Sequence, residues 1–348
     1  MLNKVDLAKQ TYAVIPTLNE EHYIETCLRS LMVGDAALSH VQFVVVDGGS
    51  DDKTVQIVER LKGEFSNLSV LHNPKKLQAA ALNLAAEQAP DGAKIMVRCD
   101  AHSIYPQDFV LTVAGKLAEI EAASVVVPMD AVGTQGYQEA NAWVVDKPLG
   151  SGGSSHRGGS KSGYVDHGHH AAFDLEVFRS LGGYDENFSH NEDAEYDHRV
   201  NEAGHKVYMY AEGRIEYMPR PTFRATWKQY FKYGRAMNMK KHGTKPKLRQ
   251  AIPIINLGIM AASVVAWGVL AATNSLLAFP LITLMTAMPI VYLSVLVLVG
   301  LVCAVKLKKI SGLNAGLALG AMHNAWALGF LKGYLFVPVE KQAIEVTV

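Results

Sequence analysis

Residues 251–305 contain no charged side chain, and most of them are apolar. An α-helix needs roughly 20 apolar residues to cross the hydrocarbon core of a bilayer, so this stretch is long enough to cross twice. The alternative is a buried helical bundle in a soluble protein, which the length and the lack of charge disfavour. We therefore predict two membrane-spanning helices, over residues 252–273 and 278–305, which turn at Asn274 and Ser275.

A third apolar segment, residues 313–331, is a weaker candidate for a span because it carries His323 and Asn324. Polar side chains are costly in the hydrocarbon core, so a buried helix of a soluble bundle remains an alternative for this segment. The sequence thus predicts a membrane domain of two to three helices over residues 251–335.

Basic residues flank the two predicted spans on both outer sides. They are Lys240, Lys241, Lys245, Lys247 and Arg249 before the pair, and Lys306, Lys308 and Lys309 after it. Positively charged flanks stay in the cytoplasm, so we expect the whole N-terminal part of the chain on the cytoplasmic side. Residues 1–10 are polar and do not have the basic and apolar regions of a signal sequence.

Two short runs in the N-terminal part, residues 13–15 and 43–46, are apolar, uncharged and rich in β-branched side chains. Buried parallel strands have this composition, and each run is followed by apolar residues at helical spacing. Open α/β sheets bind nucleotides at the carboxyl ends of their strands. Asp47 follows the second run, and Gly48 and Gly49 let a ligand approach the backbone there. We therefore expect a ligand site at this edge.

The polar residues after these two runs include good candidates for helix N-caps. Asn19 is expected to cap the first helix, and Ser50 or Asp51 the second. If these residues supply the caps, Asp47 is left free to bind a ligand. The alternative is that Asp47 is itself an ordinary turn residue.

Asp100 and His102 repeat the pattern of a polar residue beyond an apolar run, here residues 94–99. Alternate residues of an extended chain share a face, and carboxylate and imidazole donors both suit Mn²⁺. Together with Asp47, the pair predicts a site for a divalent cation, Mg²⁺ or Mn²⁺.

Residues 149–163 are too rich in glycine and serine for regular structure. A loop of this length inside a domain is usually functional or disordered. Its Arg157 and Lys161 suit a diphosphate, so we interpret it as a flexible flap over the substrates. A passive linker is the alternative.

Three histidines, His167, His169 and His170, follow the loop in a strand-like segment. They lie too close together to converge on one zinc ion, so acceptor contact or packing is the favoured interpretation. Glu192 and Asp193 then open a predicted helix. They suit the positive end of the helix dipole, but their position near a likely strand edge also favours a catalytic carboxylate.

A segment over about residues 222–242 combines aromatic and basic side chains directly before the first predicted span. Helices that lie in the membrane interface have this composition, so we predict an interfacial helix. Its Arg235 is also a candidate to contact the leaving diphosphate of a nucleotide substrate.

Several short motifs occur in an order that resembles family 2 glycosyltransferases of the GT-A fold, and more narrowly the membrane-bound ExoA group of succinoglycan glucosyltransferases. They are PTLNEE from residue 16, DGGSDD from 47, NP from 73, AALN from 80, DAH from 100, GGYDE from 182, NED from 191 and YFKYGR from 230. The resemblance implies an α/β fold, a GT-A nucleotide-sugar-binding Rossmann-like domain with a mixed central sheet over residues 1–243, followed by C-terminal transmembrane helices.

The resemblance also implies roles for individual residues. Those expected to bind the nucleotide sugar are Pro16, Thr17, Glu20, Asp47, Asp100 and Arg235. Asp100 is further expected to hold the cation, and His102 stands where the wider family has a second aspartate. Asp193 matches the family's general base.

The function implied is inverting transfer of a hexose, with UDP-glucose as the expected donor, onto a lipid-linked saccharide for extracellular or capsular polysaccharide. The place implied is the bacterial cytoplasmic (inner) membrane, with possible polysaccharide-assembly proteins as partners. One alternative is a polyprenyl-phosphate sugar transferase of the dolichyl-phosphate mannose synthase type, and another is a non-catalytic membrane scaffold or nucleotide-sugar sensor. The 33 basic and 33 acidic residues balance, which argues against nucleic acid as a partner.

Overall fold

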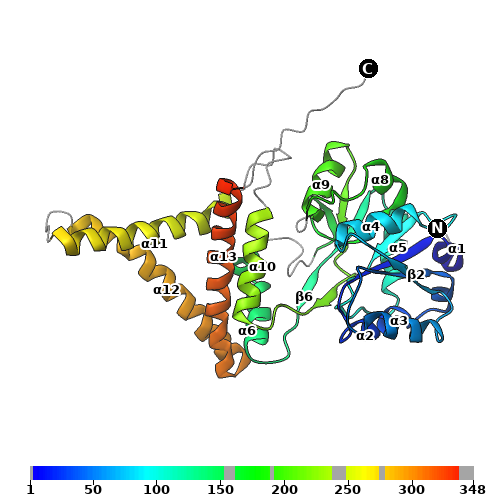
Figure 1. Cartoon of the computed structure of the whole chain (residues 1–348), viewed down its shortest axis with the longest axis horizontal. Coiled ribbons are helices and arrows are strands. Elements are labelled where there is room, and N and C mark those ends of the chain that lie inside the picture. The colour runs from blue at the N-terminus through cyan, green and yellow to red at the C-terminus, as the bar shows by residue number, and fades with distance from the viewer. Residues whose placement is uncertain (1–2, 153–160, 189–191, 237–247, 274–278, 337–348) are drawn as a thin grey trace, which may run out of the picture. The chain divides into compact units, whose positions relative to one another are not determined.

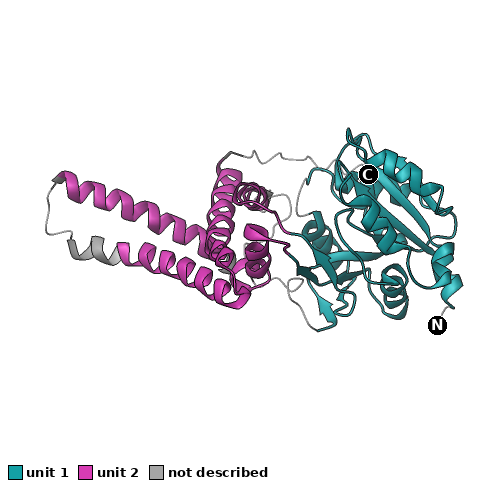
Figure 2. Ribbon diagram, turned by 90° about the horizontal axis from the view of Figure 1, so that it is seen from below, with its two compact units in different colours: residues 1–132, 153–218 teal, residues 133–152, 219–348 magenta. Residues whose placement is uncertain are grey.

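The computed structural model describes residues 3–152, 161–188, 192–236, 248–273 and 279–336. The chain divides into two compact units, drawn in different colours in Figure 2. Unit 1 comprises Met1–Val132 and Gly153–Met218, and unit 2 comprises Gly133–Gly152 and Pro219–Val348. Of the described residues, 133–152 and 219–236 therefore cluster with the C-terminal helices, although the predicted catalytic domain, residues 1–243, includes them.

Unit 1 is built on an eight-stranded sheet in the order β3-β2-β1-β4-β8-β5-β9-β7. The strands are β1 Thr11–Thr17, β2 Gln42–Asp47, β3 Leu68–His72, β4 Ile95–Arg98, β5 Ser124–Val127, β7 Gly163–Val165, β8 His169–Asp174 and β9 Val207–Met209. The first four are parallel, and β8 runs antiparallel to both β4 and β5. The mixed central sheet predicted from the resemblance is thereby confirmed.

Alternate residues of the central strands enter two separate hydrophobic cores, one on each face of the sheet. One core contains Ala13, Ile15, Phe43, Val45 and Val97. The other contains Tyr12, Val14, Val44, Val46 and Met96. Helices cover both faces, which explains why these strands are apolar throughout.

The first core is covered by α1 Lys4–Lys9, α2 Ile24–Leu31, α3 Thr54–Lys62 and α5 Phe109–Glu119. The second is covered by α4 Gln78–Glu87, α8 Leu175–Ser180 and α9 Glu192–Glu202. A 3-10 turn, η1 Ala36–His40, leads into β2. The carboxyl ends of β1 and β2 lie in register, because Thr17 pairs with Asp47.

A small parallel sheet, β6 Met129–Ala131 with β10 Ile215–Tyr217, completes unit 1. Ala131 pairs with Tyr217, and the Val132 amide donates to the Tyr217 carbonyl at 2.9 Å. The chain passes into unit 2 directly after each of these two strands.

Unit 2 is helical. Its elements are α6 Gly136–Val145, α7 Pro148–Ser151, α10 Phe223–Ala236, α11 Leu248–Thr273, α12 Phe279–Leu307, η4 Ile310–Leu313 and α13 Asn314–Phe336. The helices α10 and α13 lie side by side (Figure 1). Glycines allow this contact, because a Cβ on Gly329 would lie 2.0 Å from the Phe231 carbonyl oxygen.

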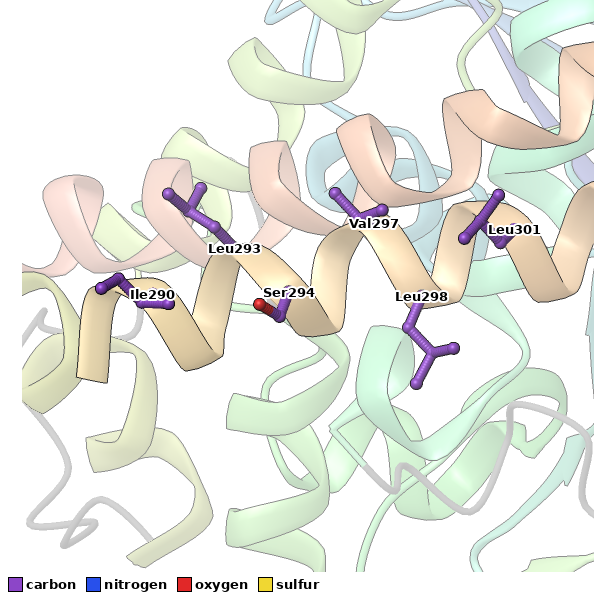
Figure 3. Close-up of a pocket in the computed structure, with 6 residues that line it drawn as sticks. All are labelled: Ile290, Leu293, Ser294, Val297, Leu298 and Leu301. Atoms are coloured by element: carbon purple, nitrogen blue, oxygen red, sulfur yellow. The ribbon is translucent and has the colours of Figure 1, made fainter. Parts of the chain in front are cut away.

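In the part of the chain that the structure describes, two helical segments are long and apolar enough to cross a membrane, Ala251–Ala272 and Thr286–Leu307. They agree with the two predicted spans. Few side chains of these two segments are buried. On α12, six residues between Ile290 and Leu301 line a pocket, which Figure 3 shows. The weaker third candidate, α13, is not among these segments. Its His323 instead lies with Nε2 2.9 Å from the Leu149 carbonyl oxygen.

Candidate functional site

The loops after β1 and β2 are joined by hydrogen bonds. The Asn19 amide donates to Ser50 Oγ at 2.8 Å, and the Asp51 amide donates to Asn19 Oδ1 at 3.0 Å. Asn19 has a φ of 57°, in the left-handed region, and α2 begins only at Ile24. The prediction that Asn19 caps this helix is therefore wrong, because its side chain is used to hold the neighbouring loop.

Asp47 holds its own turn. It accepts hydrogen bonds from the Gly49 amide at 2.8 Å, the Ser50 amide at 3.1 Å and Ser50 Oγ at 2.5 Å. Asp52, and neither Ser50 nor Asp51, accepts from the first residue of α3, through Thr54 N at 2.9 Å. The expectation that capping elsewhere leaves Asp47 free is thus wrong. Its role in binding the nucleotide sugar stays a prediction.

Asp100 lies just beyond β4 and is almost completely buried. Its Oδ1 accepts from Arg98 Nε and from Gln78 Nε2, both at 3.1 Å, and its Oδ2 lies 3.6 Å from His169 Nε2. Burial raises the pKa of this carboxyl, but the Arg98 guanidinium and two neighbouring imidazoles outweigh burial and lower the pKa to about 2. Asp100 is therefore a carboxylate at neutral pH.

His102 is a partly exposed neighbour of Asp100, and its Nδ1 lies 3.1 Å from Glu20 Oε1. Metal-binding histidines commonly donate one ring N–H to a carboxylate, which orients the other nitrogen toward the ion. The His102 imidazole also helps to lower the pKa of Asp100, so its charge acts on that carboxylate. Over the described residues, no three His, Cys, Asp or Glu side chains are grouped to hold a metal ion. A carboxylate and an oriented imidazole fit a divalent cation whose other ligands come from a diphosphate and water.

Asp193, in the first turn of α9, lies in the same network. Its Oδ1 accepts from Arg98 Nη1 at 2.8 Å and from the Tyr184 hydroxyl at 2.6 Å, and its Oδ2 lies 4.0 Å from His169 Nδ1. Burial raises the pKa of Asp193, but the Arg98 charge, the nearby imidazoles and the tyrosine hydroxyl together hold it well below its ordinary range. Asp193 is therefore ionised at neutral pH.

The GGYDE motif positions Tyr184. Gly183 has a φ of 67°, and a Cβ there would lie 2.3 Å from Asn83 Oδ1, so only glycine fits. The Tyr184 amide donates to that same Asn83 Oδ1 at 2.8 Å. Arg199 of α9 donates to the Gly183 carbonyl at 2.7 Å, which ties this turn to the helix that carries Asp193.

Glu192 is buried beside Asp193. Burial, followed by the negative charge of Asp193, raises the pKa of Glu192 to about 7. The pKa values of these two adjacent carboxyls are thus shifted in opposite directions. Neighbouring acids with separated pKa values are typical of catalytic sites, although structural ion pairs also produce them.

The three histidines divide between the site and the core. His170 is fully buried, with Nε2 2.9 Å from Asp197 Oδ1, and His167 Nδ1 lies 2.9 Å from Asp197 Oδ2. His170 of β8 and His167, which precedes β8, therefore both contact Asp197 of α9. His169, whose side chain is 12% exposed, instead lies between Asp100 and Asp193.

Sequence reasoning missed Arg98 and the placement of His169. Arg98 is a buried arginine at the end of an otherwise apolar strand, two residues before Asp100. A buried cation in such a strand needs a carboxylate partner, so the sequence could have indicated Arg98 as part of a charged site.

Three other predicted site residues lie at the end of β1 and on α10. Pro16 and Thr17 end β1, and Thr17 Oγ1 donates to the Ile15 carbonyl at 3.0 Å. Arg235 has an exposed side chain on α10 in unit 2, and its contact with diphosphate stays a prediction. Within the predicted flap, residues 153–160, including Arg157, lie outside the described residues, as do residues 237–242 of the predicted interfacial helix.

The chain was compared with protein families and with known proteins. The family model described as Glycosyl transferase family 2 matches residues 12–182. The succinoglycan biosynthesis protein ExoA of Rhizobium meliloti (strain 1021) is 37% identical, over 92% of this chain and 94% of ExoA. A dolichyl N-acetyl-alpha-D-glucosaminyl phosphate 3-beta-D-2,3-diacetamido-2,3-dideoxy-beta-D-glucuronosyltransferase of Methanococcus voltae is 26% identical, over 65% of this chain and 72% of that protein.

Among solved structures, the mannosyltransferase PcManGT from Pyrobaculum calidifontis, in complex with GDP-Man and Mn²⁺, is similar to this chain with a TM-score of 0.53. The similarity covers 91% of this chain and 87% of PcManGT at 20% sequence identity, so it bears on the fold alone. Together with the mixed sheet, it supports the GT-A fold expected from the motifs. The family match and the long alignment with ExoA establish that the chain is a glycosyltransferase and belongs to glycosyltransferase family 2.

Proposed function

We propose that this glycosyltransferase moves a hexose from a nucleotide sugar to a lipid-linked saccharide with inversion at the anomeric carbon. The observation that carries the proposal is the meeting of two ionised carboxylates, Asp100 and Asp193, on one buried arginine. Asp100 suits the diphosphate side of the reaction and Asp193 the acceptor side. A single displacement needs both functions at once.

In the proposed reaction, the acceptor hydroxyl oxygen forms a bond to the anomeric carbon while the bond to the nucleoside diphosphate breaks. Asp193 accepts the hydroxyl proton as general base. Asp100 and His102 would hold Mg²⁺ or Mn²⁺, which neutralises charge on the leaving diphosphate when bound. Glu20 orients His102 through its contact with Nδ1.

The relatives support the class of donor and acceptor. ExoA is named for succinoglycan biosynthesis, and the Methanococcus voltae relative is named for transfer to a dolichyl-phosphate-linked sugar. We accordingly propose a role in extracellular or capsular polysaccharide synthesis. UDP-glucose is the proposed donor and a lipid-linked saccharide the proposed acceptor. PcManGT was solved with GDP-Man and Mn²⁺, which is consistent with a nucleotide sugar and a divalent cation.

The membrane placement rests on unit 2. Two apolar helices suit spans of the bacterial cytoplasmic membrane, and their basic flanks favour a catalytic unit that faces the cytoplasm. The helix α10 contains no acidic residue, and its exposed cations lie at positions 224, 228, 232 and 235, along one face. This face suits the phosphate groups of an interfacial lipid layer.

The polyprenyl-phosphate transferase alternative is less well supported. Its acceptor is an already ionised phosphate, which needs no general base, whereas Asp193 is held in place by an arginine and a tyrosine. A non-catalytic scaffold has no need of this buried charge network either.

The test uses membranes that contain the full chain, Mn²⁺, a bacterial lipid extract and a panel of radiolabelled nucleotide sugars. Asp193→Asn should lower transfer by about 10² to 10⁴-fold, which is the usual contribution of a general base. Asp91→Asn, at an exposed turn, serves as the matched control and should keep full activity. Label on a lipid-linked oligosaccharide supports the proposal. Label on a single-sugar polyprenyl phosphate, or an active Asp193→Asn protein, contradicts it.

A further inference from the structure

We propose that Arg98 is a positioning residue that fixes the two catalytic carboxylates and assigns a separate task to each of their oxygens. The inference rests on the proposed function, because it takes Asp100 as the cation-side carboxylate and Asp193 as the general base.

The contacts of Arg98 show how it reaches both groups. Its Nε donates to Asp100 Oδ1 at 3.1 Å, and its Nη1 donates to Asp193 Oδ1 at 2.8 Å. The same Nη1 lies 3.4 Å from the Tyr184 hydroxyl oxygen. The arginine side chain is only 4% exposed, so water does not screen these interactions.

The local fold explains this placement. Alternate residues of a strand point to the same face, so Arg98 and Asp100 continue the direction of Met96. Met96 lies in the core that α4, α8 and α9 cover. The guanidinium therefore points toward α9, which carries Asp193 in its first turn.

Both bonds use the first oxygen of each carboxylate. The second oxygens, Asp100 Oδ2 and Asp193 Oδ2, face the two nitrogens of His169, at 3.6 Å and 4.0 Å. These separations exceed a hydrogen bond, so His169 does not use the lone pairs of either Oδ2 atom, and each can accept from a ligand. The arrangement assigns Asp100 Oδ2 to the cation and Asp193 Oδ2 to the acceptor hydroxyl.

Lysine cannot replace this arginine. A guanidinium is a planar fork whose several N–H groups bind two partners in fixed directions, whereas an ammonium is a point charge on a flexible stem. Arg98→Lys therefore retains the positive charge and loses the geometry, and Arg98→Gln loses the charge as well.

The experiment compares Arg98→Lys, Arg98→Gln, Asp193→Asn and the double variant Arg98→Lys/Asp193→Asn in the full chain. Arg179→Lys is the matched control, because Arg179 donates to the Ala86 carbonyl and lies outside the site. We measure kcat, the donor KM and thermal unfolding. Arg98→Lys should lower kcat about 100-fold or more and change the donor KM less than about threefold, as expected for an interaction used in the transition state.

The double variant separates positioning from general structural support. Groups that act as one unit give strongly non-additive losses, so adding Arg98→Lys to Asp193→Asn should cost clearly less than Arg98→Lys costs in the wild-type protein, because only the positioning of Asp100 is then left to lose. The inference is overturned if the losses of the two single variants multiply in the double variant. It is also overturned if the Arg98→Lys protein keeps a third of wild-type kcat. If neither Arg98 variant folds while Arg179→Lys does, Arg98 is a stability residue and the inference also fails. An active Asp193→Asn protein would instead refute the proposed function.

Discussion

Glu192 provides a quantitative test of the electrostatics at the start of α9. Burial and the adjacent Asp193 charge raise its pKa from 4.5 to about 7. The folded state therefore binds a proton more tightly than the unfolded state does, and stability falls as the pH rises through this interval. Glu192→Gln removes the ionisation, so it should stabilise the protein at high pH and have little effect at low pH.

The size of the effect follows from the two pKa values. A tenfold change in a proton equilibrium is worth about 1.4 kcal/mol, so the change in pKa corresponds to about 3 kcal/mol of destabilisation above pH 7. At pH 5, Glu192 is protonated in the folded state, and the same calculation gives a destabilisation of less than about 1 kcal/mol. For a unit of this size, about 3 kcal/mol raises the melting temperature by roughly 6 to 12 °C.

The assay is thermal unfolding of the purified full chain in detergent at pH 5, 7 and 8.5. Glu202→Gln is the control, because Glu202 lies on the same helix with a side chain that is 67% exposed. Its melting temperature should follow the wild-type protein at every pH. A Glu192→Gln gain that is equal at pH 5 and pH 8.5, or a loss at pH 8.5, would refute the electrostatic argument.

Three further changes test other contacts. Glu20→Gln should weaken Mn²⁺ binding about tenfold by releasing His102, as titrated by electron paramagnetic resonance; unchanged affinity would show that this pair does not orient a ligand. Tyr184→Phe removes a hydrogen-bond donor to Asp193, so turnover should fall about tenfold. The pKa of Asp193 should rise, which should move the acidic limb of the pH–rate profile to higher pH. An acidic limb that does not move would argue against Asp193 as the titrating group. Gly329→Leu should lower the melting temperature of the full chain by forcing α10 and α13 apart, at a cost of about 3 kcal/mol, and a wild-type melting curve would contradict the close contact.

Local composition was sufficient to predict the apolar elements. Most residues of β1, β2 and the candidate spans in α11 and α12 are apolar, and that property is visible within each segment alone. A strand that is buried on both faces, or a helix suited to cross a membrane, needs an apolar composition whatever its neighbours are. This composition can therefore be recognised from the segment alone.

One wrong prediction and two omissions involve groups whose partners lie far away in the chain. Asn19 was expected to cap the nearest helix, but it binds a loop 31 residues away. Arg98 reaches Asp193 across 95 residues of sequence, and His169 approaches the same carboxylate from β8. Such contacts depend on strand order and on the register of β8, which the motifs do not specify.

The paired strands β6 and β10 carry a consequence for protein engineering. The chain leaves the catalytic unit twice from this one parallel ribbon, after residues 132 and 218, so that unit is discontinuous in sequence. A truncation at residue 218 would remove α13 and leave behind α6, which packs against it. The buried side chains Ala140, Ala142, Val144 and Val145 would then be exposed to solvent. A soluble catalytic fragment therefore requires replacement of residues 133–152 by a short polar linker as well as removal of the C-terminal helices.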